Sequence, residues 1–381
     1  MNKFIFRSAL AIFSALSLSL ASCGDDDDDP PFTTDPVEDN DSIVTPNPDD
    51  NDTIATPDPE EKTPAGVFVI NSGSFFSGVN GTLSFLDYSS NTLTDSLFVN
   101  VNGRTLGGTP NDIVLYGSKL YIAVTDENRI EIVDAHTLHS LSYIEQKQPR
   151  CLVAANGKVY ASTYEGTVIS VDTASLAKAA TSEVVGSRLE GITAMGDYIY
   201  VCNAYNPDNS KNTNVVKLNA RNLSKVKDIN VTVNPTRITN DGSNLYVQST
   251  GNYEDISPCI QRVSVNNDSI ETLCSGTYMA ILNNKIYSVN SVYGQPSEYL
   301  VYDLATGKTS QFIDGSDIYC PCAIAADPAK DIIYISSYNE SAYGSADYAG
   351  RGYIVAYSAD GTKLSKYNAG VAPIAFAFWK K

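Results

Sequence analysis

Few side chains in this sequence are suited to catalysis or metal binding. The 381 residues include only two histidines, His136 and His139, and no Cys-x-x-Cys pair. A lone His-x-x-His pair lacks the further ligands that zinc requires. Both histidines are expected in one turn, away from the candidate binding face described below, so no Ser/His/Asp triad can form at that face. We therefore expect no metal site and no cofactor.

Two carboxylates, Asp112 and Glu190, could work as a general acid and a general base. Such a pair needs one carboxyl group with a raised pKa and a second that stays ionised. Binding or structural roles are the simpler interpretation of both residues, and no other motif indicates catalysis. We expect a protein that is not an enzyme, with catalysis by these carboxylates as an alternative.

The seven cysteines permit disulfides. Cys23 belongs to a lipidation signal, which leaves six cysteines, an even number that an exported protein can pair. A two-residue turn at Asn266-Asn267 would place Cys259 opposite Cys274 on neighbouring strands. Opposite residues of this kind lie about 5.5 Å apart at Cα, within the range of a disulfide. We expect these two cysteines to be joined.

Residues 1–22 have the character of a lipoprotein signal peptide. Lys3 and Arg7 precede a short apolar stretch. Leu-Ala-Ser-Cys at residues 20–23 matches a lipobox, the motif at which a lipoprotein signal peptide is cleaved before the lipidated cysteine. Cleavage would make Cys23 the new N-terminus, and its acyl chains would anchor the protein at about 0.8 kcal/mol per buried CH₂. The alternative is a short N-terminal anchor helix.

Residues 23–63, which start with the lipidated cysteine, are expected to form a disordered acidic linker. Residues 24–63 hold 15 acidic residues and one lysine, for a net charge of −14, and almost no apolar bulk. Such a segment cannot bury enough surface to offset its ordering entropy. The signal peptide carries +2, so residues 64–381 keep only −6 of the total −18. A folded part without a basic excess does not favour nucleic acid as a partner.

The five aspartates at residues 25–29 directly follow the lipobox. They resemble the acidic export signal that sends Bacteroidetes lipoproteins to the outside of the outer membrane. Alternatively, these acids only keep the linker soluble. We expect a lipid-anchored protein exposed at the surface of the outer membrane, with no membrane contact besides the anchor.

A repeated phrase between residues 64 and 381 predicts the elements that position the remaining candidates. It consists of an inner strand, a turn with Gly or Asn, and a second strand centred on an aromatic residue, as in PNDIVLYGSKLYIAV from residue 110. It returns near residues 149, 189, 235, 276 and 321, at intervals of 39, 40, 46, 41 and 45 residues. This spacing is typical of the four-stranded blade of a β-propeller. Val-Asp at 133–134 and 171–172, and Tyr-Asp at 302–303, mark the end of a third strand.

The two ends of this region predict one more blade. Residues 66–71, GVFVIN, look like a second strand without a first, and residues 373–379, PIAFAFW, are a seventh inner strand with nothing after it. Pairing them would leave no open edge in the ring. The expected fold class is all-β: one seven-bladed β-propeller over residues 64–381, closed by its N- and C-terminal strands. Six or eight blades are alternatives if one interval hides a merger.

Propeller geometry collects certain residues on one face, around the mouth of the central channel. The loops that enter the inner strands and the loops between second and third strands both open there. Aromatic side chains with polar tips suit a broad, flat ligand, because they offer large contact area at little cost in side-chain entropy. Tyrosines inside strands are expected instead to pack blade against blade. The candidate ligand-binding residues are Phe75, Phe76, Asn111, Asp112, Asp126, Arg150, Tyr164, Glu190, Tyr205, Arg237, Tyr253, Tyr278, Tyr293 and Tyr338.

Several phrases carry a family resemblance. They are FVINSGS from residue 68, NGTLS from residue 80, LGGTPNDI from residue 106, Gln148-Pro-Arg and Glu190-Gly-Ile. Over about residues 65–379 the chain resembles the YncE-like propeller lipoproteins of Bacteroidetes, above all their BtuG-like, cobalamin-binding members. The resemblance implies capture of vitamin B12 (cobalamin) or a related corrinoid, and its transfer to a BtuB-like TonB-dependent transporter of the outer membrane. The alternative is a surface propeller that binds protein or glycan as a scaffold or adhesin.

Overall fold

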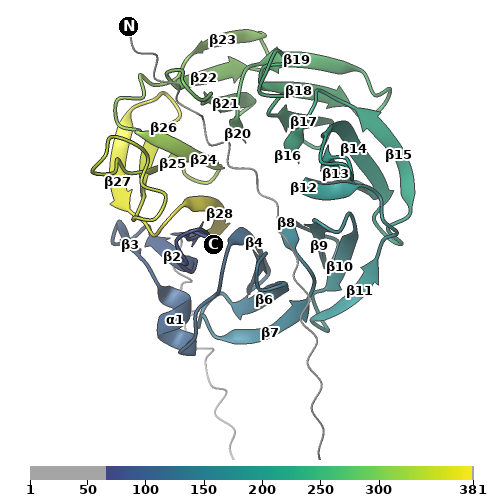
Figure 1. Cartoon of the computed structure of the whole chain (residues 1–381), viewed down its shortest axis with the longest axis horizontal. Coiled ribbons are helices and arrows are strands. Elements are labelled where there is room, and N and C mark those ends of the chain that lie inside the picture. The colour runs from purple at the N-terminus through teal and green to yellow at the C-terminus, as the bar shows by residue number, and fades with distance from the viewer. Residues whose placement is uncertain (1–65, 380–381) are drawn as a thin grey trace, which may run out of the picture. The chain divides into compact units, whose positions relative to one another are not determined.

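The computed structural model describes residues 66–379, which form a ring of seven four-stranded antiparallel sheets (Figure 1). The expected all-β, seven-bladed propeller is confirmed. The expected signal peptide, the lipidated Cys23 and the acidic linker lie outside the described residues. We number the blades in chain order, beginning with the blade that holds both ends of the ring.

Each blade has four strands that follow one another from the channel outward, and blade 1 takes its inner strand from the end of the chain. The inner strands of blades 1 to 7 are β28 (Pro373–Trp379), β4 (Pro110–Tyr116), β8 (Pro149–Ala155), β12 (Ser187–Met195), β16 (Pro235–Asn240), β20 (Tyr278–Leu282) and β24 (Cys320–Asp327). The second strands are β1 (Gly66–Asn71), β5 (Lys119–Val124), β9 (Lys158–Thr163), β13 (Tyr198–Tyr205), β17 (Asn244–Ser249), β21 (Lys285–Asn290) and β25 (Ile332–Tyr338). The third strands are β2 (Thr82–Asp87), β6 (Arg129–Asp134), β10 (Val168–Asp172), β14 (Lys211–Asn219), β18 (Cys259–Ser264), β22 (Glu298–Asp303) and β26 (Tyr353–Ser358). The outer strands are β3 (Thr92–Thr94), β7 (Ser140–Glu145), β11 (Ala177–Thr181), β15 (Lys225–Asn230), β19 (Ile270–Cys274), β23 (Lys308–Gln311) and β27 (Lys363–Asn368).

The two faces of the ring carry different connections, because neighbouring strands alternate in direction. Loops between second and third strands, and links from one blade to the next inner strand, lie on what we call the mouth face. Turns between first and second strands, and between third and fourth strands, lie on the opposite face, which we call the turn face. The ring both begins at Gly66 and ends at Trp379 on the turn face, where these two residues pair.

The ring closes where β1 pairs with β28, as the two ends of the sequence predicted. The register runs from Gly66 opposite Trp379 to Asn71 opposite Pro373. The Asn71 side chain reinforces the closure: its amide nitrogen donates to Ser84 Oγ at 2.8 Å, and its amide oxygen accepts from the backbone N–H of Gly370 at 3.1 Å. A Cβ at residue 370 would lie 2.6 Å from the Asn71 side chain, so this contact requires glycine.

Seven hydrophobic clusters hold the ring together, and each lies between two neighbouring blades. One joins blade 1 to blade 2 through residues that include Trp379 and Leu120. Another joins blade 7 to blade 1 through residues that include Tyr334 and Val67. The other five fill the remaining blade interfaces. Burial of one large apolar side chain stabilises by about 1.5–3 kcal/mol, and every blade is stabilised in this way from both sides.

An aromatic residue occupies the third position of each second strand and is buried between blades. In blade 1 it is Phe68. In blades 2 to 7 it is Tyr121, Tyr160, Tyr200, Tyr246, Tyr287 and Tyr334, all 0–2% exposed. The hydroxyl of Tyr160 donates to the backbone oxygen of Ala220 in the next blade at 2.9 Å, and Tyr287 donates likewise to Ala359 at 3.0 Å. The expectation that these tyrosines pack blade against blade is confirmed.

The third strands β6, β10 and β22 end at Asp134, Asp172 and Asp303, as the Val-Asp and Tyr-Asp pairs predicted. Each carboxylate accepts backbone N–H groups of the turn that follows, for example Asp172 Oδ1 from Ser175 N at 2.7 Å. For Asp172 these hydrogen bonds lower the pKa below its usual value, because they stabilise the ionised form. The repeated aspartate therefore shapes the tight turns of the turn face.

One short helix, α1 (Leu97–Asn102), interrupts the β pattern between β3 and β4, and the sequence did not predict it. It buries Phe98, and the chain just after it is held to blade 2 by charge. Arg104 forms an ion pair at 2.6 Å with Glu131, a fully buried residue that Arg129 also contacts at 3.0 Å. No helix within residues 66–379 is long and apolar enough to cross a membrane.

The expected disulfide between Cys259 and Cys274 is not formed, and both side chains are free thiols. The register of β18 and β19 follows the expected count from Val263 opposite Ile270 as far as Gln261 opposite Thr272. A β-bulge then adds one residue to β19 and places Cys274 opposite Ile260 instead. Counting outward from a turn cannot detect such an insertion.

Ring closure leads to a first prediction. Deletion of residues 373–381 removes β28, uncovers the edge of β1 and takes Trp379 from its cluster. Cooperative thermal unfolding, followed by circular dichroism, should then be lost or strongly weakened. Deletion of residues 380–381 alone is the matched control and should leave the transition in place. An unchanged transition after the larger deletion would show that β28 is dispensable for the ring.

Candidate functional site

Six of the seven inner strands are bulged where they begin at the mouth face. Five of these strands carry a proline at or next to their start, which has no N–H to donate and is tolerated at strand starts and bulges; β12 is bulged without one. A bulge bends the strand and re-aims its side chains. The residues that the bulges leave without a register partner are Asn111, Arg150, Cys151, Glu190, Gly191, Thr236, Cys322 and Ile374. The local backbone thus directs the candidate side chains toward the channel mouth.

Four inner strands carry charges of alternating sign around the mouth. Asp112 lies on β4, Arg150 on β8, Glu190 on β12 and Arg237 on β16. All four were predicted as site residues, and the structure brings them together. Their formal charges cancel, which reduces the cost of holding them in a partly buried place.

Arg150 and Glu190 form the central ion pair of this group, at 3.2 Å, and their side chains are only 15% and 13% exposed. Tyr164 completes it: its hydroxyl donates to Glu190 Oε1 at 2.7 Å, and the Arg150 guanidinium lies 4.3 Å from the centre of its ring. Burial works to lower the pKa of Arg150, but the Glu190 carboxylate overrides it and raises that pKa. Burial is also the main reason that the pKa of Tyr164 is raised. These three side chains are fixed before any ligand arrives.

The side chains of Asp112 and Asn111 form hydrogen bonds that join blade 2 to blade 3. The Asp112 carboxylate accepts the backbone N–H of Leu152 at 2.8 Å, and the Asn111 amide donates to the backbone oxygen of Arg150 at 2.8 Å. Burial raises the pKa of Asp112, and the charge of Arg237 opposes that shift. Asp112 and Glu190, the two carboxylates of the catalytic alternative, are therefore both held by fixed donors.

Blades 6 and 7 contribute a neutral, aromatic part of the mouth. Tyr278 begins β20 and Tyr338 ends β25, and both are half-buried. The Tyr338 ring meets Tyr348 edge-on with a centroid distance of 4.9 Å. Burial raises the pKa of both Tyr278 and Tyr338, so these phenols stay neutral at physiological pH. Cys322 between them is buried, and burial raises the pKa of its thiol to about 12.

Blades 4 and 5 add a third group in which cations lie over tyrosine rings. Lys211 Nζ lies 4.3 Å from the Tyr205 centroid and 4.7 Å from the Tyr253 centroid, and it donates to the Tyr205 hydroxyl at 2.8 Å. The Arg188 guanidinium lies 5.4 Å from the Tyr205 centroid. Tyr205 and Tyr253 were predicted site residues, and both belong to this group.

The other predicted residues lie on the rim, away from these groups. Phe75 and Phe76 are 61% and 73% exposed in the β1–β2 loop and meet edge-on at 5.5 Å. Asp126 follows β5 and accepts a hydrogen bond from Thr109. Tyr293 is fully exposed in the β21–β22 loop. These positions can contact only a ligand that extends beyond the mouth.

The sequence analysis missed three residues of the mouth: Arg188, Lys211 and Tyr348. Arg188 stands directly before the repeated inner-strand phrase, at a left-handed φ of 51° that recurs before other inner strands. Lys211 begins β14, beyond the loop that contained the predicted tyrosine. Tyr348 lies in the β25–β26 loop, whose length was the available signal, because long loops often carry function.

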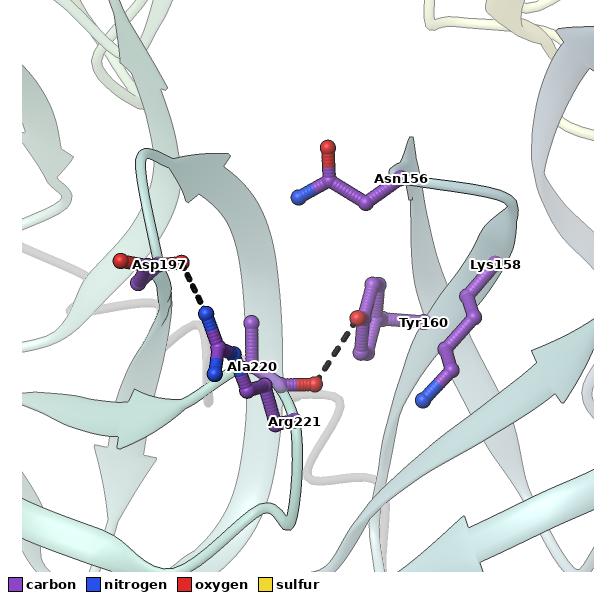
Figure 2. A pocket seen from close by; sticks show the side chains of 6 residues that line it. All are labelled: Asn156, Lys158, Tyr160, Asp197, Ala220 and Arg221. Carbon is purple, nitrogen blue, oxygen red and sulfur yellow. Dashed lines mark hydrogen bonds and ion pairs between the residues drawn. The ribbon is translucent and has the colours of Figure 1, made fainter.

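The turn face carries a shallow recess of about 350 Å³ between blades 3 and 4. Figure 2 shows its lining, with Arg221 directed toward Asp197 and the Tyr160 hydroxyl toward Ala220. Arg221 and Asp197 form an exposed ion pair at 3.7 Å. Four of the six lining residues bond to one another in these two pairs, and the recess gathers far fewer charged and aromatic groups than the mouth, so we place the candidate site at the mouth.

His136 and His139 lie between β6 and β7 on the turn face, as expected. The His136 ring packs edge-on against Trp379 at 4.8 Å. Within residues 66–379, no three His, Cys, Asp or Glu side chains are grouped as a metal site would need.

The fold and the mouth define a seven-bladed β-propeller with a preformed polar and aromatic channel opening. The chain belongs to the family described as a domain of unknown function (DUF5074), whose family model matches residues 65–372. A comparison with curated proteins gave no match.

Solved structures of similar fold include three bacterial proteins. A quinonprotein alcohol dehydrogenase-like protein of Bacteroides thetaiotaomicron has a TM-score of 0.62 and 17% identity, over 83% of this chain and 78% of its own. A Bacteroides fragilis protein described as a candidate 6-phosphogluconolactonase has a TM-score of 0.61 and 11% identity, over 85% and 100%. A Lactobacillus plantarum protein has a TM-score of 0.58 and 15% identity, over 83% and 100%. At these identities the likeness concerns the fold alone.

The Arg150–Glu190–Tyr164 group leads to a second prediction. Glu190→Ala leaves a half-buried guanidinium without its counter-charge and should lower the free energy of unfolding by about 2 kcal/mol or more. Tyr164→Phe removes one hydrogen bond and should cost about 1 kcal/mol. Glu165→Ala, which breaks the exposed pair with Lys147, is the control and should change little. Urea unfolding measures all three, and equal values for Glu190→Ala and Glu165→Ala would contradict the prediction.

Proposed function

We propose that this protein is a surface lipoprotein that captures vitamin B12 or a related corrinoid at the mouth face and passes it to an outer-membrane TonB-dependent transporter. The observation that carries the proposal is the mouth itself, in which neutral tyrosines lie beside a fixed group of charged side chains. The resemblance to BtuG-like lipoproteins supports the choice of ligand.

The chemistry of a corrinoid suits this mouth. A corrin is a broad ring with amide side chains along its edge, so it needs a wide apolar surface and hydrogen-bonding groups around it. Tyr278, Tyr338 and Tyr348 offer aromatic area with polar tips. The charged half of the mouth, with Arg150 and Glu190, offers donors and acceptors to amides. A flat ligand can therefore meet both kinds of surface at once.

The mouth is also preorganised, which favours tight binding. Arg150 is held by Glu190 and by the Tyr164 ring, so it loses little freedom when a ligand binds. The tyrosines also lose little side-chain entropy on binding, because a tyrosine side chain has few rotatable bonds. A binding protein that delivers its ligand benefits from such a rigid face, because affinity then depends on fit and not on ordering.

The described ring begins on the face opposite the proposed site. Gly66 begins β1 on the turn face, opposite the mouth. We propose that residues 23–63 are a tether and that the acyl chains on Cys23 hold it in the outer membrane.

A second candidate function is a surface propeller that binds protein or glycan. The observation that favours it is the exposure of large aromatic side chains on mouth-face loops: Phe76 and Tyr253 are each 73% exposed, and Tyr343 is 95% exposed. Exposed aromatic groups of this kind mark interaction surfaces. Corrinoid binding decides between the two functions.

Titration with cyanocobalamin, followed by calorimetry, tests the first function. We expect saturable binding, and alanine at Tyr164, Tyr205, Tyr253 or Tyr338 should cost about 2 kcal/mol or more at one or two of these positions.

The controls for that titration are His136→Ala and His139→Ala on the turn face, which should leave the affinity unchanged. Loss of binding in the control variants while every mouth variant binds normally would place the site elsewhere. Absence of any corrinoid binding would favour the protein- or glycan-binding function.

The lipid anchor leads to a further prediction. Cys23→Ala removes the acylated residue, so the protein should no longer incorporate labelled palmitate and should leave the membrane fraction. Cys259→Ala, in the propeller, is the matched control and should keep both properties. Membrane attachment of the Cys23 variant would refute the lipobox interpretation.

A further inference from the structure

Most arginines of the propeller have an acidic partner, and two do not. Of the eight arginines in residues 66–379, six form ion pairs: Arg104, Arg129, Arg150, Arg221, Arg262 and Arg351. The two without an ion pair in this part of the chain are Arg188 and Arg237, and both lie at the mouth in blades 4 and 5. No carboxylate of the described residues forms a direct ion pair with either arginine, although Asp112 and Glu190 act on Arg237 from farther away and help to raise its pKa.

Arg237 is half-buried and has few partners within residues 66–379. Its one hydrogen bond runs from Nη1 to the Cys151 sulfur at 3.5 Å, a weak acceptor. A guanidinium has five N–H donors, and none of the Arg237 nitrogens is both buried and unbonded, so the remaining donors keep some access to solvent. The nearest carboxylates are already engaged, Asp112 with backbone N–H groups and Glu190 with Arg150.

Lys211 adds a third cation to the same sector. Its contacts are the Tyr205 hydroxyl and the rings of Tyr205 and Tyr253, and it forms no ion pair in the described ring. The Arg188 guanidinium lies over the same Tyr205 ring, 5.4 Å from its centroid. Tyrosine rings hold these cations in place without neutralising them.

Three acids lie in the neighbouring loops, Asp208, Glu254 and Asp255, and two of them are engaged there. Asp208 accepts the backbone N–H and the hydroxyl of Ser210, and Asp255 accepts the Asn252 amide. These loop carboxylates form no ion pair with Lys211, Arg188 or Arg237 in the described residues. The positive sector is therefore local, in a propeller region of net charge −6.

We infer that Arg188, Lys211 and Arg237 form the subsite that receives an anionic group of the ligand, while the Tyr278–Tyr338 side receives its broad corrin ring. Charge-assisted hydrogen bonds from arginine to a phosphate are strong and directional, which makes this subsite selective. In a cobalamin the anionic group is the phosphodiester of the nucleotide loop. Arg150 is excluded from this role because Glu190 neutralises it. The inference rests on the proposed function and assigns the ligand's orientation.

The test compares cyanocobalamin with dicyanocobinamide, a corrinoid that lacks the nucleotide loop and its phosphodiester. In the triple variant Arg188→Gln, Lys211→Gln, Arg237→Gln, the dissociation constant for cyanocobalamin should rise about tenfold or more. The constant for dicyanocobinamide should change less than about threefold. Arg237→Lys, in an otherwise unchanged protein, should keep more cyanocobalamin affinity than Arg237→Gln, because it keeps the charge. Arg221→Gln on the turn face is the matched control and should change neither constant.

The possible outcomes separate the inference from the proposed function. If the triple variant loses both corrinoids equally, the anionic subsite is refuted while corrinoid capture stands. If the unmodified protein binds neither corrinoid, corrinoid capture is refuted, and ³¹P line widths of inorganic phosphate decide the subsite. If the phosphate lines are broader with the unmodified protein and with Arg221→Gln than with the triple variant, the subsite is supported. If the line widths are equal with all three proteins, the subsite is refuted. The melting temperature of each variant confirms that it is folded.

Discussion

Pairing of β1 with β28 is the constraint on which the rest of the molecule depends. The seven hydrophobic clusters lie between blades, so each blade is stable only with a neighbour on both sides. An open row of blades would leave two apolar faces and two free strand edges at its ends. The pairing of Gly66 with Trp379, and the Asn71 contacts to Ser84 and Gly370, turn that row into a ring.

Closure also determines what the mouth can be. Once seven inner strands converge, side chains from blades distant in sequence must share one small space. The bulges at the strand starts aim charged residues into that space, and the alternation of Asp112, Arg150, Glu190 and Arg237 keeps their charges balanced. The neutral tyrosines of blades 6 and 7 then complete an opening with two chemical halves. The chemical character of the mouth is thus a consequence of ring closure.

Local regularities explain why much of the fold could be predicted. The repeated phrase places each inner strand, the buried Tyr121 and its equivalents recur in step, and aspartates such as Asp172 mark the turns. These signals depend on residues close in sequence. The helix over Leu97–Asn102 and the bulge before Cys274 escaped prediction, because one is too short to show a period and the other adds a residue that no local pattern announces. The site shows the same contrast. Residues within the repeated phrase, such as Arg150, were predicted, whereas Lys211 and Tyr348, which lie outside it, were missed.

The sequence by itself determined the number of blades, the strands that close the ring and the face where loops gather, because strand period, turn residues and repeat length are local properties. Only the tertiary structure decided how the mouth is divided. Glu190 neutralises Arg150 and leaves Arg237 without a carboxylate partner among the described residues, although the two arginines occupy similar places in their repeats. The physical reason is that ion pairing depends on distances between side chains of different blades, and those distances are set only when the ring is closed.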